Sequence, residues 1–120
     1  MRTTLLWLVL LLVLTLVSPG SAVAAGPMQF WNLTGETVTS LTLAPAGSDK
    51  FGPNQCANDK DGGVDNDERL KLTGVAPGRY DVRVGLPKGR MCVVRGVELK
   101  GDRKYAFSLE PADLTDCTGP

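Results

Sequence analysis

The sequence contains no histidine, and this absence removes most routes to catalysis near neutral pH. Histidine is the side chain whose ordinary pKa lies closest to physiological pH, and it provides the base in Ser-His-Asp and Cys-His catalytic arrangements. Glycine-rich phosphate-binding motifs are missing as well, since neither GxxxxGK[ST] nor GxGxxG occurs in the sequence. We therefore expect the protein not to be an enzyme.

An excess of charge of one sign is also absent, and aromatic residues are few. The sequence has 13 basic and 13 acidic residues, and aromatic residues make up 6% of it. A near-neutral balance provides no electrostatic basis for binding nucleic acid or an anionic membrane. The aromatic residues are scattered, which indicates use in a core and not a platform on which bases stack. We expect no nucleic-acid partner.

Only one long apolar run occurs, at residues 5–17, and its surroundings have the parts of a secretory signal peptide. Arg2 precedes the run, and the small residues at 21–25 offer an A-x-A-like cleavage site. The run is shorter than the ~20 apolar residues that span a bilayer. We predict a signal peptide at residues 1–25, a single domain at 26–120 without a membrane span, and a periplasmic or secreted location.

Cysteine is scarce too, with three residues in all. In an oxidising compartment the simplest arrangement is one disulfide and one leftover thiol, and three pairings are possible. If a tight turn at residues 100–102 joins two antiparallel strands, Cys92 lies near Glu110, and the short C-terminal tail can bring Cys117 over it. We predict a Cys92–Cys117 disulfide. The leftover Cys56 is then either buried and inert, which we favour, or paired with another chain.

Short segments in which apolar and polar residues alternate predict an all-β domain. The expected strands are, in chain order, residues 28–32, 37–43, 69–73, 79–84, 91–99 and 103–110. We expect the first two to pair, the last four to form an antiparallel meander, and Gly96 to mark a β-bulge. In the loop at 44–57, Phe51 is the only large apolar residue, so we expect it to attach the loop to the core. The fold predicted is a small antiparallel β-sandwich of about six strands, with an open barrel as the alternative.

Residues 57–68, ANDKDGGVDNDE, are the only stretch that looks like a binding site. In a calcium-binding loop, oxygen ligands recur at alternate positions, a glycine at the sixth position permits the curl, and a glutamate at the twelfth closes the loop. Gly62 occupies the sixth position here, but Ala57 stands at the first, where a direct ligand is needed. The matching ligand positions are Asp59, Asp61, Asp65 and Glu68. We favour a solvated Asp/Asn/Gly loop, with weak Ca²⁺ binding by these four residues as the alternative.

A set of short motifs runs through nearly the whole chain after residue 25. They are N-x-T-G at 32–35, LAPAGS at 43–48, FGPNQC at 51–56, NDKDG at 58–62, DERL at 67–70, G-x-Y-D at 78–81, G-R-x-C at 89–92 and LTDC at 114–117. In this combination the sequence resembles a family of small exported proteobacterial proteins that is usually labelled twin-arginine-pathway signal protein. The resemblance implies a periplasmic or secreted protein and no particular activity. Two positions depart from it: Arg2 stands alone instead of in a pair, which favours general secretion, and Phe51 replaces the expected tryptophan.

Residues 72–82, LTGVAPGRYDV, are similar to a hairpin of prealbumin-like β-sandwich modules. In those modules the pattern L-x-G-x-x-P-G-x-Y-x-V follows an Asp/Gly turn and a strand. The similarity implies a binding or spacer module. We therefore predict an exported, non-enzymatic accessory, structural or protein-binding domain whose partner is an envelope protein. The alternative is a calcium-dependent β module that uses the loop at 57–68, and an enzyme of unidentified type ranks third.

Overall fold

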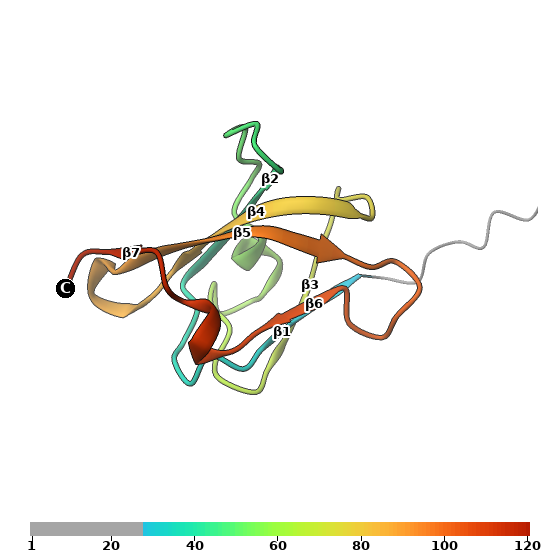
Figure 1. Ribbon diagram of the computed structural model, residues 1–120. Coiled ribbons are helices and arrows are strands. Elements are labelled where there is room, and N and C mark those ends of the chain that lie inside the picture. The colour runs from blue at the N-terminus through green and yellow to red at the C-terminus, as the bar shows by residue number, and fades with distance from the viewer. Residues whose placement is uncertain (1–27) are drawn as a thin grey trace, which may run out of the picture.

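Figure 1 shows the computed structural model of the chain, which describes residues 28–120. The predicted signal peptide at residues 1–25 lies outside the described part. Residues 28–120 form seven strands and three short 3-10 turns, and the strands are arranged in two sheets. The predicted all-β sandwich is thus confirmed. No helix in the described part of the chain is long and apolar enough to cross a membrane.

The larger sheet has four antiparallel strands in the order β2-β4-β5-β7. Their bounds are Ser40–Pro45 for β2, Gly78–Gly85 for β4, Met91–Leu99 for β5 and Cys117–Thr118 for β7. The turn η2 (Pro87–Gly89) joins β4 to β5, and Lys88 and Gly89 both have positive φ there, at 64° and 77°. Glycine suits such a turn because it lacks the Cβ atom that makes positive φ costly.

The smaller sheet has three strands in the order β3-β1-β6, and it forms the lower layer in Figure 1. Their bounds are Arg69–Lys71 for β3, Gln29–Asn32 for β1 and Phe107–Leu109 for β6. Strand β3 is antiparallel to β1, whereas β6 runs parallel to it. The turn η3 (Pro111–Asp113) then leads the chain back to the larger sheet.

A four-stranded antiparallel sheet is confirmed, but its members differ from those predicted. Strand β2 pairs with β4 and not with β1, while the predicted strands at 69–73 and 103–110 contribute β3 and β6 to the other sheet. The sequence pattern could not reveal this, because alternation shows which side chains face the core and not which strand lies alongside. The bulge expected at Gly96 is present, since the register between β4 and β5 shifts between Tyr80 and Val82.

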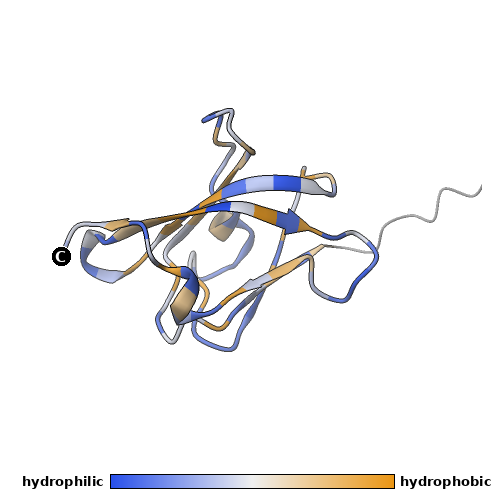
Figure 2. Cartoon of the chain, in the orientation of Figure 1, coloured by the Kyte–Doolittle hydropathy of each residue, from blue (hydrophilic) through white to orange (hydrophobic). Residues whose placement is uncertain are grey.

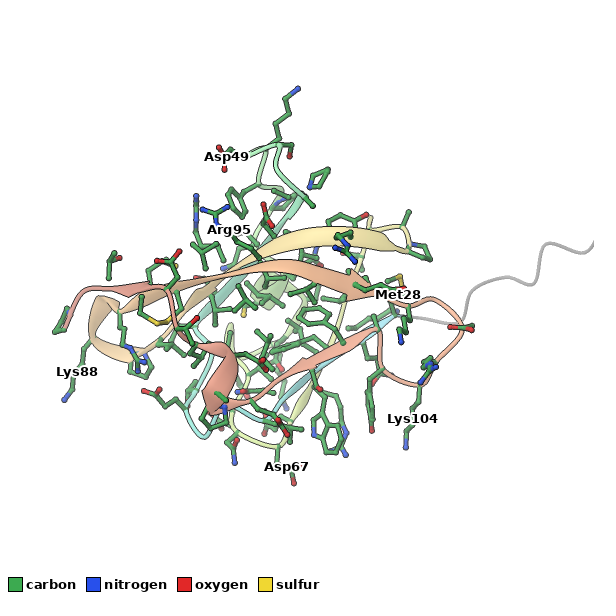
Figure 3. The ribbon with its side chains drawn as sticks, viewed as in Figure 1. Met28, Asp49, Asp67, Lys88, Arg95 and Lys104 are labelled. Atoms are coloured by element: carbon green, nitrogen blue, oxygen red, sulfur yellow. A yellow bond between two sulfur atoms is a disulfide. The ribbon has the colours of Figure 1, made fainter. Side chains whose placement is uncertain are left out.

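The core lies between the two sheets, where the side chains of both layers meet (Figure 3). Figure 2 shows hydrophobic residues along the strands of both layers. Phe30 of β1 and Phe107 of β6 pack with ring centroids 4.9 Å apart. The same core cluster includes Leu41, Val82 and Val84 from the larger sheet, each fully buried. Along β2 and β4, every second side chain therefore points into the core, as the alternation in the sequence predicted.

Residues 52–58, which include the turn η1 (Gln55–Asn58), cover the outer edge of β2, and we call them the closing segment. The Gly52 amide donates to the Leu43 carbonyl at 2.9 Å. The Leu41 amide donates to Oδ1 of Asn54 at 2.9 Å, and that oxygen also caps η1 by accepting from the Cys56 amide. Backbone groups that would otherwise stand open at a sheet edge are thereby paired within the chain.

The same closing segment also covers the outer edge of β3 and of the residues that follow it. The side-chain amide of Gln55 imitates a neighbouring strand: Oε1 accepts from the Thr73 amide at 3.0 Å, and Nε2 donates to the Thr73 carbonyl at 3.1 Å. Asn58 Nδ2 donates to the Lys71 carbonyl at 2.8 Å. The FGPNQC and NDKDG motifs thus contain the side chains that join one edge of each sheet.

Phe51 does not attach its loop to the core, so that prediction is wrong. Its half-buried ring lies under the guanidinium of Arg83, with Cζ 3.9 Å from the ring centroid. This cation-π contact lies on the outer face of the larger sheet, where Arg83 is exposed. Cys56 is the residue of this region that enters the core.

The disulfide joins Cys92 to Cys117, as predicted, and Cys56 is free and buried. The geometry differs from the expected one, because Cys117 belongs to β7 and faces Cys92 directly in the β5–β7 ladder. The Cys56 side chain is fully buried, with Sγ 3.7 Å from the Val38 carbonyl oxygen. Burial raises the pKa of its thiol to about 11, so very little of the reactive thiolate exists near neutral pH.

Candidate functional site

The acidic loop at residues 57–68 is divided in two by Val64, whose side chain is fully buried. The backbone of Val64 pairs with that of Val38, with N–H···O distances of 2.8 and 2.9 Å in the two directions. Val64 occupies the eighth position of the calcium spacing, which is apolar, and its burial anchors the middle of the loop to the core.

Three of the four predicted calcium ligands accept hydrogen bonds from their own surroundings. Oδ1 of Asp59 accepts from the Asp61 amide at 2.8 Å. Oδ1 of Asp65 accepts from the Thr37 hydroxyl at 2.8 Å, and Oε2 of Glu68 accepts from the Asp65 amide at 3.2 Å. These bonds hold the loop in shape through Asx-type turns and one contact to the preceding strand region.

The structure brings three of these four residues to one place. Asp59, Asp61 and Glu68 border a shallow surface depression, whereas Asp65 lies outside its lining. The remaining lining residues include one further carboxylate, Asp67, and two cations, Lys60 and Arg69. Within residues 28–120, no three His, Cys, Asp or Glu side chains are grouped closely enough to hold a metal ion.

Asn32, at the end of β1, is fully buried and connects the acidic loop to the start of the domain. Its Nδ2 donates to the carbonyls of Glu36 and Val64, each at 2.8 Å. Its Oδ1 accepts from the amide and the hydroxyl of Thr34, at 3.0 and 2.7 Å. The side-chain amide thus uses both of its donors and both of its acceptor positions. This network explains the N-x-T-G motif as a structural turn.

A second cluster lies on the outer face of the smaller sheet, and we call it the aromatic-cationic cluster: Trp31, Arg69 and Tyr105. Trp31 faces outward because its neighbour Phe30 faces the core, and Arg69 lies opposite Trp31 in the β1–β3 register. The rings of Trp31 and Tyr105 lie 4.9 Å apart. Arg69 Cζ lies 5.0 Å from the Trp31 ring and 5.5 Å from the Tyr105 ring.

Hydrogen bonds fix the orientation of all three side chains. Nε of Arg69 donates to the Tyr105 hydroxyl at 2.9 Å, and Nε1 of Trp31 donates to Oδ1 of Asp67 at 3.0 Å. The bond from Arg69 lowers the pKa of the Tyr105 hydroxyl, because the cation favours the phenolate, and it raises the pKa of Arg69 in return. Trp31 and Tyr105 are half-buried and Arg69 is exposed, so the cluster is ordered yet accessible.

The expectation that all aromatic residues serve the core is therefore wrong for Trp31 and Tyr105. Alternation in β1 could have placed Trp31 outside, since Phe30 is the better core residue. Tyr105 could not have been placed in this way, because the alternation slips before β6: Ala106 and Phe107 are adjacent and both buried.

Asp81 is the buried carboxylate of the larger sheet, with its side chain 4% exposed at the β4–β5 bulge. Its two oxygens accept from the amides of Gly47 and Gly96, at 2.9 and 3.0 Å, and Arg95 lies 3.5 Å away. Figure 3 shows Arg95 on the outer side of this sheet. The two backbone hydrogen bonds, together with the weaker effect of Arg95, hold the pKa of Asp81 below its usual range.

This depressed pKa predicts a loss of stability in acid. The contribution of Asp81 is fully present above the ordinary carboxyl pKa of about 3.9, and it is lost as the pH falls toward the lower value of the folded state. We expect the melting temperature of the wild type to fall more steeply below about pH 4 than that of Asp81→Asn, when circular dichroism melts are compared across pH. Asp102→Asn, at an exposed position, is the control and should keep the wild-type slope. Equal slopes for wild type and Asp81→Asn would contradict this assignment.

No protein-family model, curated protein or solved structure matches the chain. The resemblance to exported proteobacterial proteins therefore remains a prediction. Two surface features of residues 28–120 bear on function, the acidic loop and the aromatic-cationic cluster.

Proposed function

We propose that the protein is an exported, non-enzymatic accessory module that binds an envelope protein through the outer face of the smaller sheet. The observation that carries the proposal is the aromatic-cationic cluster of Trp31, Tyr105 and Arg69 on that face. Trp, Tyr and Arg are enriched among the residues that contribute most of the binding energy at protein interfaces. Because these side chains already hold one another in place, binding would cost little of their conformational freedom.

Two features support export. The N-terminal sequence has the parts of a signal peptide. The Cys92–Cys117 bond is of a kind that persists in oxidising compartments such as the periplasm and the extracellular space. We therefore place the protein in the periplasm or outside the cell, where an envelope protein is the available kind of partner.

Other features support a non-catalytic role. The sequence has no histidine, and the thiol of Cys56 is buried and protonated. The shifted pKa of Asp81 is explained by hydrogen bonds that join β4 to its neighbours, which is a structural use of a carboxylate. Strongly perturbed groups do mark many active sites, but structural networks perturb pKa values too.

Capture from an envelope extract tests the proposed function. Immobilised wild-type protein should retain a partner that Trp31→Ala and Arg69→Ala retain at least tenfold less, because each change removes part of the cluster. Arg79→Ala, at an exposed position of β4 in the other sheet, is the matched control and should retain the partner like the wild type. Melting curves of each variant show whether it is folded. Retention of the same protein by both cluster variants, or of none by the wild type, would refute the proposal.

Calcium binding is the second candidate function, favoured by the convergence of Asp59, Asp61 and Glu68 on one depression. With a dissociation constant of ~1 mM, 10 mM Ca²⁺ would stabilise the native state by about 1.4 kcal/mol, which raises the melting temperature by several degrees. The control is 10 mM Mg²⁺ at equal ionic strength. A double variant with Asp59→Asn and Asp61→Asn should fold normally and lose the response. No shift of the wild type with Ca²⁺ would reject this candidate.

A further inference from the structure

The outer face of the smaller sheet is cationic as well as aromatic. Strands β1, β3 and β6 contain no Asp or Glu, whereas β3 turns Arg69 and Lys71 outward on the same face. Lys104 adds a third cation beside the ring of Tyr105, with Nζ 5.4 Å from the ring centroid. Figure 3 shows Lys104 directed away from the interior of the sandwich on this side.

None of these three cations forms an ion pair with a carboxylate of the described chain. The ion pairs within residues 28–120 are Arg90–Glu36 and Arg95–Asp81, and neither involves this face. Asp67, which accepts from Nε1 of Trp31, also lies near enough to Arg69 to raise the pKa of its guanidinium. The positive charge of Arg69 is thus partly offset, whereas Lys71 and Lys104 form no ion pair with the described residues, and a surface with these cations beside an ordered aromatic pair complements a negatively charged ligand.

We infer that this face binds an extended acidic segment of the partner protein, with carboxylates at alternate positions that face the sheet. This inference rests on the proposed function. Arg69 and Lys71 are two residues apart on one strand, so their backbones are separated by about 7 Å. Side chains at alternate positions of another extended chain have the same separation, so two carboxylates of the segment can meet the two cations at once.

A polypeptide fits this face better than a denser polyanion does. The acidic loop ends beside the face at Asp67 and Glu68, and it would repel the closely spaced phosphates of nucleic acid or the surface of an anionic membrane. The sequence as a whole also has no net positive charge with which to attract them. An acidic segment of a few residues can follow β3 and β1 without lying over the acidic loop.

The test uses a fluorescein-labelled peptide in which glutamate alternates with valine, and its binding to the intact protein is followed by fluorescence anisotropy. We expect saturable binding that weakens at least tenfold between 50 and 500 mM salt, because the contacts are exposed and screened. Binding should also weaken at least tenfold for the same peptide with glutamine in place of glutamate. The double charge reversal Lys71→Glu with Lys104→Glu should have the same effect on the glutamate peptide. The matched control, Lys50→Glu with Arg79→Glu, makes an equal change of charge at exposed positions away from this face and should bind like the wild type.

The outcomes separate this inference from the proposed function. If the glutamate peptide does not bind but capture of an envelope protein still depends on Trp31, the inference of an acidic segment is overturned and the proposed function stands. Failure of both would overturn both. Equal binding of the glutamine peptide, or tighter binding of heparin or single-stranded DNA, would overturn the inference in favour of an apolar or a polyanion site. A wild-type dimer in sedimentation that the Lys71/Lys104 reversal dissociates would overturn it in favour of a second copy.

Discussion

Asn32→Asp is expected to lower the free energy of unfolding by about 3–5 kcal/mol, because it places an unpaired charge where a fully bonded amide stood. The change alters one atom and adds no volume. It removes the two donors that serve the carbonyls of Glu36 and Val64, and it turns a carboxylate oxygen toward those carbonyls instead. The turn that joins β1 to the acidic loop should loosen first.

Urea denaturation at pH 7 measures this effect, and Asn66→Asp is the matched control. The exposed Asn66 uses only its oxygen, which accepts from the Gly35 amide at 2.8 Å, so a carboxylate can replace it. Burial raises the pKa of the carboxyl introduced at position 32 above its unfolded value. The penalty is therefore complete above that raised value and shrinks as the pH falls toward the ordinary carboxyl range. A loss below about 1 kcal/mol, or one equal to that of Asn66→Asp, would show that the network is not structural.

Removal of the disulfide is the second change with a large expected effect. Cys92 and Cys117 are 25 residues apart, and closing a loop of that length stabilises a domain by about 2–4 kcal/mol, mainly by restricting the unfolded chain. Replacing both cysteines with alanine should lower the free energy of unfolding by this amount. Strand β7 has only two residues, so without the covalent bond its pairing with β5 should open locally before the domain unfolds.

Hydrogen exchange distinguishes the loss of global stability from the local opening of β7. The Val93 amide donates to the Asp116 carbonyl at 2.9 Å, and its protection should disappear in the double alanine variant. The amide of Leu72, which is bonded to Met28 in the other sheet, should keep most of its protection and serves as the internal control. If reduction of the wild type leaves both the stability and the Val93 protection unchanged, then β7 is held by its neighbours and not by the disulfide.

The sequence predicted the direction of side chains better than the pairing of strands. Alternation in the fourth expected strand correctly assigned Val82 and Val84 to the core, since a period of two is a property of the strand itself. Sheet membership depends instead on contacts between segments far apart in the chain. The parallel pairing of Phe30 with Phe107 joins the two ends of the domain, and no local pattern encodes it.

For the candidate sites, too, the sequence predicted local patterns better than contacts between distant residues. The calcium spacing placed Val64 at the apolar eighth position, and in the structure it is buried, but its partner Val38 lies in a segment that the spacing does not include. The aromatic-cationic cluster joins residues 31, 69 and 105, which are too distant in the sequence to form a motif. The disulfide was predicted correctly, but for a different reason. We expected the C-terminal tail to fold over the end of β6, whereas in the structure Cys117 belongs to the strand β7 and pairs with β5.

The closing segment protects one edge of each sheet. Two sheets have four edges, at β2, β3, β6 and β7, and the side chains of Asn54, Gln55 and Asn58 occupy the first two. A strand that adds to β2 or β3 would have to displace these side-chain hydrogen bonds, so the closing segment opposes edge-to-edge association at one edge of each sheet. The two amide residues of the FGPNQC motif thus act as edge protection, because each replaces a strand that would otherwise have to come from another molecule.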